Sequence, residues 1–348
     1  MSTRPERWPL DSHDIVVIGA SAGGVEALRD IARDLPAGLP AAVIVVLHVA
    51  PTGTSALAGI LHRAGPLPAV AVVDGDPIEP GRIYVAPPDC HVLVEDGRLR
   101  LDGGPRQNGH RPAVDPLFRS AADVYGPRVV GVILSGSLDD GSLGLSHVKA
   151  RGGVAIIQDP EDAFASGMPA SALRAVAADQ VVPAAEVAAL LVEFAHGREV
   201  ASRTAAPEPD ERERDEREPA WLSENSSGYR CPECGGSLWE RQHGEIVQFK
   251  CRVGHVYSLE TMLSEQAKAL EAAMWSALQA LQERESMLRR LAARVGERGH
   301  NRSARSFERQ ANEAAERATL IRETITRRPA GPVPGELEHE ASREAKAS

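Results

Sequence analysis

Short apolar runs alternate with stretches of helical spacing over residues 14–195, and this alternation is the strongest constraint on the fold. The runs occupy residues 15–18, 42–47, 83–85, 91–94, 129–134 and 154–157. Continuous apolar runs rich in Val and Ile are typical of strands that are buried on both faces. Helical segments between such strands predict a doubly wound, mostly parallel α/β sheet.

The composition limits the classes of protein to which this chain can belong. Hydrophobic residues make up 43% of the sequence and aromatic residues only 4%, so we expect a core of Val, Ile, Leu and Ala. The formal net charge of −10 argues against a general nucleic-acid binder, which needs a basic surface to meet phosphates. The chain shows no secretory signal and no apolar run of the roughly 20 residues that a membrane span requires. We therefore expect a cytoplasmic protein.

A glycine-rich turn follows the first predicted strand. The segment Gly19-Ala20-Ser21-Ala22-Gly23 fits the G-x-S-x-G pattern, in which small residues permit a sharp turn that exposes a serine hydroxyl. A helix is predicted to follow, and the free N–H groups of Ala22 and Gly23 at its start are suited to stabilising an oxyanion. Similar turns bind phosphate or serve only packing, although neither G-x-G-x-x-G nor a P-loop is present.

Two other strand ends carry the partners that a serine nucleophile needs. His48 ends one apolar run, and Asp139 and Asp140 follow another in a glycine-rich turn. Sites in open α/β sheets gather at the carboxyl ends of the strands, so we expect Ser21, His48 and an aspartate at one edge. The alternatives are a capping histidine, and aspartates that serve the turn or a metal. The order Ser, His, Asp differs from that of α/β-hydrolases and disfavours their fold.

Several separated motifs together resemble the chemotaxis-type protein-glutamate methylesterases, whose catalytic domains are called CheB-type. The motifs are residues 19–24, the strand that ends in His48, and residues 86–89, 110–115, 134–136 with 140–141, and 167–169. The resemblance implies a serine hydrolase that removes methyl esters from glutamate side chains of chemoreceptor-like proteins, and that also deamidates glutamine. It implies Ser21 as nucleophile, His48 as base and Asp140 as orienting acid, with no cofactor for catalysis.

The chain departs from the family pattern in two places. Family members usually carry a phosphorylation-controlled receiver domain before the esterase domain, whereas only a short tail precedes Asp14 here. We therefore expect no receiver domain and no control by phosphorylation within this chain. The family typically has Met-Gly where this sequence has Ser137-Leu138. The resemblance implies that this loop, including Ser137, lines the oxyanion site.

Three of the four cysteines lie close together late in the chain. Two residues separate Cys231 from Cys234, and three separate Cys251 from His255. Thiolate and imidazole ligands at this spacing suit tetrahedral zinc, and a full set of four protein ligands predicts a structural rather than a catalytic site. His243 is an alternative ligand. Zinc modules of this kind also bind nucleic acid, but the surroundings here are not strongly basic.

Apolar residues at steps of three, four and seven follow the cysteine cluster. The first set is Leu263, Ala267, Leu270, Met274, Ala277, Leu281, Leu288, Leu291 and Val295, and the second is Ala304, Phe307, Ala311, Ala314, Ala318, Ile321 and Ile325. This spacing predicts an antiparallel helical hairpin with a coiled-coil-like seam. We expect the hairpin to mediate self-association or to dock on a helical receptor.

The sequence thus predicts six parts. They are an N-terminal tail (1–12), a methylesterase domain (13–198), a disordered linker (199–227), a zinc-binding module (228–260), a helical hairpin (261–328) and a disordered tail (329–348). The leading function is a methylesterase in signal transduction. The alternatives are an amidase that uses the same triad, and a non-catalytic signalling adaptor that works through the zinc and helical modules.

Overall fold

The computed structural model divides the chain into two compact units, Met1–Met262 and Leu263–Ser348. It describes residues 13–50, 55–197, 226–243 and 246–327. The predicted tails at 1–12 and 329–348, and nearly all of the predicted linker at 199–227, lie outside the described residues. Among the described helices, none is both long enough and apolar enough to cross a membrane.

A seven-stranded sheet forms the centre of the first unit, with the order β10-β9-β8-β1-β2-β5-β3 and parallel pairing throughout. The strands are β1 (Ile15–Ala20), β2 (Ala42–Leu47), β3 (Ala69–Ala71), β5 (Arg82–Val85), β8 (Val129–Ile133), β9 (Val154–Gln158) and β10 (Gln180–Val182). Every residue of β1, β2, β8 and β9 is buried, because their aliphatic side chains face apolar layers on both sides. The predicted fold class is confirmed.

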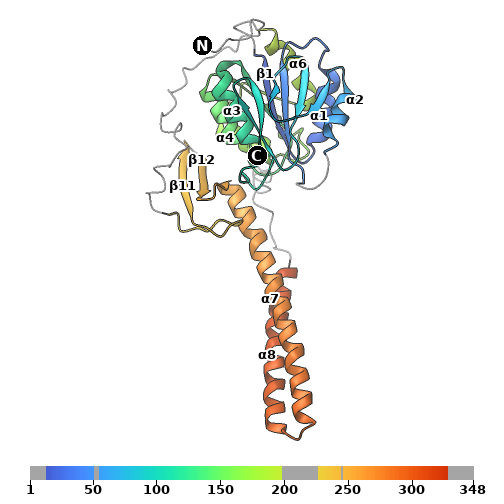
Figure 1. The fold of residues 1–348 in the computed structure, drawn as a ribbon, viewed down its shortest axis with the longest axis vertical. Helices are drawn as coiled ribbons and strands as arrows, with labels where there is room; N and C mark the ends of the chain where they lie inside the picture. Colours follow the sequence, from blue (N-terminus) through green and yellow to red (C-terminus); the bar gives the residue numbers. More distant parts are fainter. Residues whose placement is uncertain (1–12, 51–54, 198–225, 244–245, 328–348) are drawn as a thin grey trace, which may run out of the picture. The chain divides into compact units, whose positions relative to one another are not determined.

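Helices cover both faces of this sheet (Figure 1). The helices on one face are α1 (Gly24–Asp34), α2 (Leu57–Ala64) and α6 (Ala184–Ala195), and those on the other are α3 (Val114–Tyr125), α4 (Ser142–Ala150) and α5 (Gly167–Ala175). Alternate residues of β1 enter the two cores: Val16 and Ile18 join the core with α1, and Ile15 and Val17 join the core with α3. A short 3₁₀ turn at Gly126–Arg128 leads into β8.

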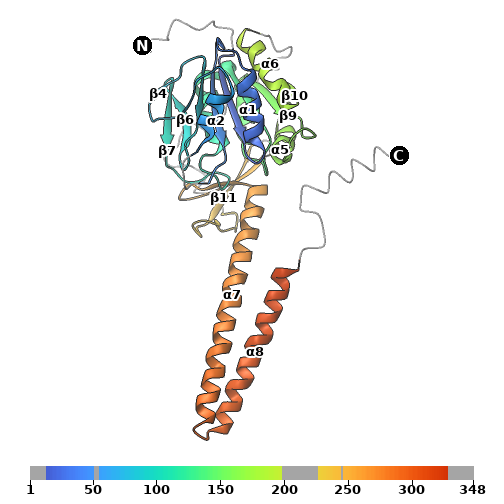
Figure 2. The ribbon, with the colours of Figure 1, turned by 90° about the vertical axis from the view of Figure 1, so that its right-hand side faces the viewer.

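The predicted strand at residues 91–94 does not join the parallel sheet. A separate antiparallel sheet has the order β4-β7-β6 and consists of β4 (Asp76–Pro77), β6 (His91–Glu95) and β7 (Arg98–Asp102) (Figure 2). Asp96 and Gly97 both have positive φ, 48° and 77°, as in a two-residue hairpin turn, so β6 pairs directly with β7. Assigning this run to the parallel sheet was wrong. Its apolar character reflects Val92 and Val94, which pack in the core beneath α3.

A third sheet, also antiparallel, lies within the predicted zinc-binding module. Its strands, in spatial order, are β11 (Leu238–His243), β12 (Ile246–Cys251) and β13 (Val256–Ser258). Its buried core consists of Cys231, Leu238, Phe249, Cys251, Tyr257 and Met262. A core this small supplies little hydrophobic stabilisation, so other interactions are needed to hold the module together.

Two long helices, α7 (Leu259–Gly296) and α8 (Asn301–Thr326), run side by side and are joined by a short turn (Figures 1 and 2). The predicted helical hairpin is confirmed. In α8 the predicted seam is correct, since its alanines are buried at Ala304, Ala311, Ala314 and Ala318.

The predicted seam of α7 is wrong at several positions. Leu263, Leu270 and Leu291 are exposed, and Leu278 and Ala292, which lie outside the predicted seam, are buried. Leu288 is buried as predicted. Helix α7 has 38 residues and α8 has 26, so the N-terminal turns of α7 have no α8 residues opposite them. A helical pattern read along one chain does not show where its partner helix ends.

Candidate functional site

Ser21 lies directly after β1 in a turn that only glycine permits. Gly23 has φ 77°, and a Cβ there would lie 2.5 Å from the Cβ of Phe164. A Cβ at Gly24 would lie 2.6 Å from that of Ala20. The Ser21 N–H donates to the Ser135 carbonyl at 2.9 Å, which ties the turn to the loop after β8. Ser21 itself is half-buried and is held in this rigid turn.

The sheet brings the three predicted strand ends together. Residues Ala20 and Leu47 are partners in the parallel register, and β8 pairs with β1 on its other side. Ser21 and His48 therefore follow the carboxyl ends of two adjacent strands, and the loop that leads to Asp140 follows the next. A Cβ at Gly136 in this loop would lie 2.9 Å from the Cβ of Ser21.

His48 and Asp140 form a buried pair. Their Nε2 and Oδ2 atoms are 2.7 Å apart, and the side chains are 4% and 2% exposed. The Nδ1 atom of His48 is also buried and has no hydrogen-bond partner in the part of the chain that the structure describes. The His110 ring stacks on that of His48, with centroids 3.7 Å apart and an interplanar angle of 9°. The imidazole thus has one nitrogen bound to the acid, the other available, and a defined ring plane.

Asp140 is held as a carboxylate by several donors. Its Oδ2 also accepts the Val114 N–H at 2.7 Å, and its Oδ1 accepts Asn108 Nδ2 at 3.0 Å. Burial by itself raises the pKa of Asp140, but the hydrogen bond and charge of His48 and the Val114 N–H outweigh it and hold the pKa below its usual range. The acid is therefore both ionised and fixed in orientation.

Two neighbouring carboxyl groups have the opposite character. Burial and the nearby charge of Asp140 raise the pKa of Asp115 to about 7. Burial raises the pKa of Asp139 to about 6, and the charges of Glu260 and Asp140 contribute in the same direction. Asp140 is thus the carboxyl group of this cluster that is ionised at the lowest pH.

The loop between β8 and α4 contains the predicted oxyanion residue Ser137. Ser137 is exposed, and its backbone packs against Gly167, where a Cβ would lie 3.1 Å from the Ser137 Cα. Leu138 has φ 62°, in the left-handed region that favours glycine. Ala22 and Gly23 lie at the start of α1, as expected.

Val114 fills a space between β1, which precedes Ser21, and the loop that carries Asp140. A Cβ at Gly19 would lie 2.4 Å from Val114 Cγ1, and a Cβ at Gly141 would lie 2.8 Å from the same atom. One valine side chain therefore packs against two glycines. Because its N–H binds Asp140, its packing also sets the position of the acid.

No pattern in the sequence predicts a role for Asn108 or His110. His110 lies within a recognised motif, but nothing in its spacing predicts that it stacks on His48. The Asn108-Gly109 pair is a common turn signal, and both residues have positive φ, 50° and 73°. That signal locates the turn but not the contact between Asn108 and Asp140.

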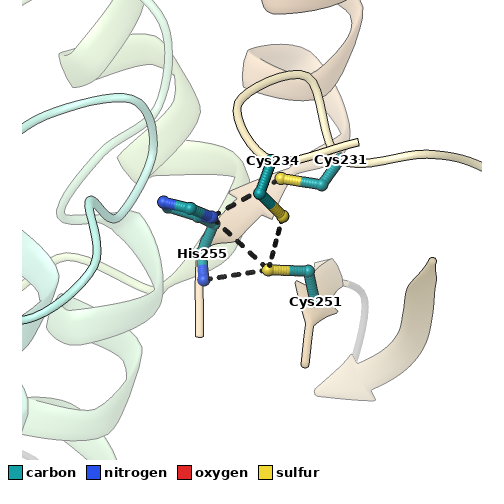
Figure 3. Close-up of side chains that lie close together, drawn as sticks. All are labelled: Cys231, Cys234, Cys251 and His255. Atoms are coloured by element: carbon teal, nitrogen blue, oxygen red, sulfur yellow. Dashed lines mark hydrogen bonds between the residues drawn. The ribbon is translucent and has the colours of Figure 1, made fainter. Parts of the chain in front are cut away.

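The four predicted metal ligands gather in the module (Figure 3). Their ligand atoms all lie within 4.8 Å of one another, and the set contains His255 rather than the alternative His243. Cys234 Sγ lies 3.7 Å from Cys251 Sγ, and His255 Nδ1 lies 3.5 Å from Cys251 Sγ. Tetrahedral zinc, with bonds of about 2.3 Å to sulfur and about 2.0 Å to nitrogen, requires S···S near ~3.8 Å and S···N near ~3.5 Å. The donor set fits such an ion.

The carboxylate of Glu233 contacts the imidazole nitrogen of His255 that faces away from the sulfur atoms. Glu233 Oε2 lies 3.2 Å from His255 Nε2, so that Nδ1 faces the three sulfur atoms. Such carboxylate–histidine pairs orient metal-binding imidazoles and select their tautomer. The arrangement leaves no position for a substrate, which indicates a structural site.

Comparison with known proteins places the α/β domain in a family. The model of the CheB methylesterase family matches residues 16–191, just over half of the chain. The chain belongs to this family. The matched segment contains Ser21, His48 and Asp140 but ends before the metal-ligand group and the helical hairpin.

Individual relatives agree with this assignment. A protein-glutamate methylesterase/protein-glutamine glutaminase of Rhodospirillum rubrum is 41% identical over 191 residues, which are 53% of this chain and 49% of that protein. The protein-glutamate methylesterase FrzG of Myxococcus xanthus is 36% identical over 56% of this chain and 60% of its own length. The chain spans about half the length of the curated relatives it matches.

A solved structure shows the same fold. The CheB methylesterase catalytic domain of Thermotoga maritima is 38% identical, with a TM-score of 0.50, over 52% of this chain and 97% of that one. The similarity therefore concerns the α/β domain.

Proposed function

We propose that this protein is a protein-glutamate methylesterase, a serine hydrolase that removes methyl groups from glutamate side chains of chemoreceptor-like proteins. The observation that carries the proposal is the buried His48–Asp140 pair beside the Ser21 turn, with Nδ1 of His48 left available. Family membership and the names of the relatives supply the substrate class.

In this mechanism His48 Nδ1 takes the proton of Ser21 as the hydroxyl oxygen attacks the ester carbonyl. Asp140 keeps the imidazole in the required tautomer and stabilises its charged form. The N–H groups of Ala22 and Gly23, and the loop at Ser137, stabilise the oxyanion. His48 returns the proton to the leaving methanol. Water then attacks the acyl-enzyme, with His48 again as base, and releases the glutamate carboxylate.

The test is the release of methanol from a methylated chemoreceptor by the wild type and by Ser21→Ala. We expect release by the wild type and a loss of at least about 10⁴-fold in the variant, since a triad acts as a unit. Turnover by Ser21→Ala at the wild-type rate excludes Ser21 as nucleophile. A folded wild type that is inactive on receptor ester contradicts the proposed substrate and favours the adaptor function.

Deamidation of glutamine by the same residues is a second proposed activity. It is favoured by the names of the relatives, several of which are glutaminases as well as methylesterases. Ammonia release from a receptor with glutamine at the methylation sites measures it. A wild type that releases methanol but no ammonia limits the activity to esters.

Structural zinc is proposed for Cys231, Cys234, Cys251 and His255, supported by the fit of their spacing to a tetrahedral ion. Co²⁺ replacing the native metal gives thiolate charge-transfer absorption in such a site. We expect that absorption in the wild type and its loss in Cys251→Ser. Its absence in the wild type contradicts the site.

The proposed location of the protein is the cytoplasm, where thiolates of this kind stay reduced.

The helical hairpin is proposed to bind the helical part of the receptor. Apolar side chains are exposed along it at Leu270, Trp275, Met287, Leu291 and Leu320. Deletion of residues 263–348 is expected to raise KM for the receptor and leave the oligomeric state unchanged. A change of oligomeric state with unchanged KM instead assigns the hairpin to self-association.

A further inference from the structure

Strand β13 of the metal module binds the α/β domain. The Asn108 N–H donates to the Val256 carbonyl at 2.7 Å, and the Val256 N–H donates to the Arg106 carbonyl at 3.4 Å. Gln107 and Val256 thereby form a short parallel bridge. Both segments lie in the same compact unit. The module is thus attached to the loop that carries Asn108.

Asn108 connects this strand to the acid of the proposed triad. Its side chain is buried, and Nδ2 donates both to Asp140 Oδ1 at 3.0 Å and to Asp115 Oδ2 at 3.1 Å. Its Oδ1 accepts the Ser258 N–H of β13 at 3.0 Å. Only this orientation of the amide gives donors to the carboxylates and an acceptor to the N–H. The left-handed backbone, φ 50°, suits asparagine.

A second group of contacts reaches the residue before the acid. Asp139 Oδ1 accepts the hydroxyl of Ser258 at 2.7 Å and that of Thr261 at 3.1 Å. An ion pair of 2.6 Å between Arg174 and Glu260 extends the same contact. The two consecutive aspartates of the acid loop are therefore both held from the module, Asp139 directly and Asp140 through Asn108.

The metal-ligand group lies immediately next to this contact. His255 directly precedes Val256, the first residue of β13, and the His255 carbonyl accepts the Cys251 N–H at 3.0 Å. With so small an apolar core, the position of β13 depends on the ligand group.

We infer that the metal module is a positioning element for the triad: ion binding holds β13, β13 holds Asn108, and Asn108 orients Asp140 toward His48. This inference rests on the proposed function, because it concerns the regulation of that site. Asn108 acts through Asp140 and is a positioning residue. Metal loading then controls the reactivity of Ser21.

The experiment follows covalent labelling of Ser21 by a fluorophosphonate, which requires an activated serine but no receptor. The full chain is compared with a ligand variant (Cys231→Ser with Cys234→Ser), with Asn108→Gly, with both changes together, and with Asn108→Asp. Glycine removes the side chain without straining the left-handed backbone. Aspartate keeps the shape and the acceptor for Ser258 but loses the donor to Asp140.

We expect labelling to slow by about ten- to hundredfold in the ligand variant and in each Asn108 variant, as for a misplaced catalytic group. The combined variant should be no slower than the slower of its two parents, because both changes act through one contact. Hydrogen exchange at the Val114 amide, which binds Asp140, should accelerate in all of them. With the receptor ester, kcat should fall while KM stays constant.

Asp123→Asn is the matched control. It weakens ion pairs with His147 and Arg151 between α3 and α4, away from the acid loop, and should label at the wild-type rate.

Wild-type labelling in either the ligand variant or Asn108→Asp overturns the inference, and so do independent, multiplicative effects in the combined variant. A wild type that labels at Ser21 but releases no methanol contradicts the proposed substrate and leaves the inference standing. A wild type that does not label overturns both.

Discussion

The parallel sheet and the metal module are held together in different ways. The sheet buries four complete strands between two apolar cores, so many side chains share its stability. The module has six core residues, two of which belong to the proposed metal-ligand group. Ser21 and His48 sit on the first kind of structure, whereas Asp140 also depends on the second through Asn108. The proposed site therefore combines residues held by the stable parallel sheet with an aspartate whose position also depends on the metal module.

Metal removal should give the largest difference between the two regions. Structural zinc contributes on the order of 10 kcal/mol to small modules of this kind, so chelation should unfold β11–β13. Hydrogen exchange should show loss of protection in β11 and β12 and unchanged protection in β1, β2 and β8. Equal loss of protection in the parallel sheet contradicts the comparison.

A core truncation in the α/β domain should have the reverse effect. Phe118 is fully buried and packs against Gly131 and Gly144. Phe118→Ala should lower the free energy of unfolding of the sheet by about 3–5 kcal/mol. Urea denaturation measures that loss, and titration of the metal checks that its affinity stays the same. A weaker affinity for the metal in Phe118→Ala shows that the fold of the module depends on the stability of the parallel sheet, which contradicts the comparison.

The free energy of unfolding should depend on pH through Asp139, which lies at the contact between the α/β domain and the metal module. Its folded pKa of about 6 exceeds the unfolded value, so the folded state binds the proton more tightly. Stability from this group is present below about pH 4 and is lost as the pH rises to about 6. Asp139→Asn keeps the acceptor for Ser258 and should reduce this loss by on the order of 2 kcal/mol. Urea denaturation at about pH 4 and pH 8 tests it, and an unchanged difference contradicts it.

The smallest expected change in stability comes from Leu138, in the loop between β8 and α4. Leu138 occupies the left-handed region, which costs a non-glycine residue roughly 1–2 kcal/mol. Leu138→Gly should therefore stabilise the α/β domain by at most about 1 kcal/mol, because glycine also loses more backbone entropy. A higher urea midpoint supports this, whereas a lower one shows that the Leu138 side chain contributes packing that offsets the strain.

The sequence predicted what depends on local pattern. Aliphatic runs located five of the seven strands of the parallel sheet but not the short strands β3 and β10. The carboxyl ends of three of these strands led to the prediction of Ser21, His48 and Asp140. The spacing of the cysteines predicted the group of Cys231, Cys234, Cys251 and His255, whose ligand atoms lie close together. These features follow from strand burial and ligand geometry, which leave traces within a few residues.

Features that depend on distant partners escaped prediction. Asn108 meets Asp140 and Ser258 from remote parts of the chain, and neither contact leaves a periodic trace. The run at residues 91–94 resembles the parallel strands in sequence because burial sets its apolar composition. Burial does not show whether a strand pairs in parallel or antiparallel. The predicted seam of α7 is wrong at Leu263 and Leu270 because α8 is shorter than α7 and has no residues opposite them.

The packing of Val114 has a consequence for sequence evolution. Its side chain occupies the space left by Gly19 and Gly141, so the three positions share one volume. A larger residue at Gly19 is compatible with the fold only beside a smaller one at position 114, whereas Gly141 is also restricted by its φ of 95° and by Ile133. Among relatives, positions 19 and 114 should therefore change together, although they lie far apart in the sequence, and position 141 should stay glycine.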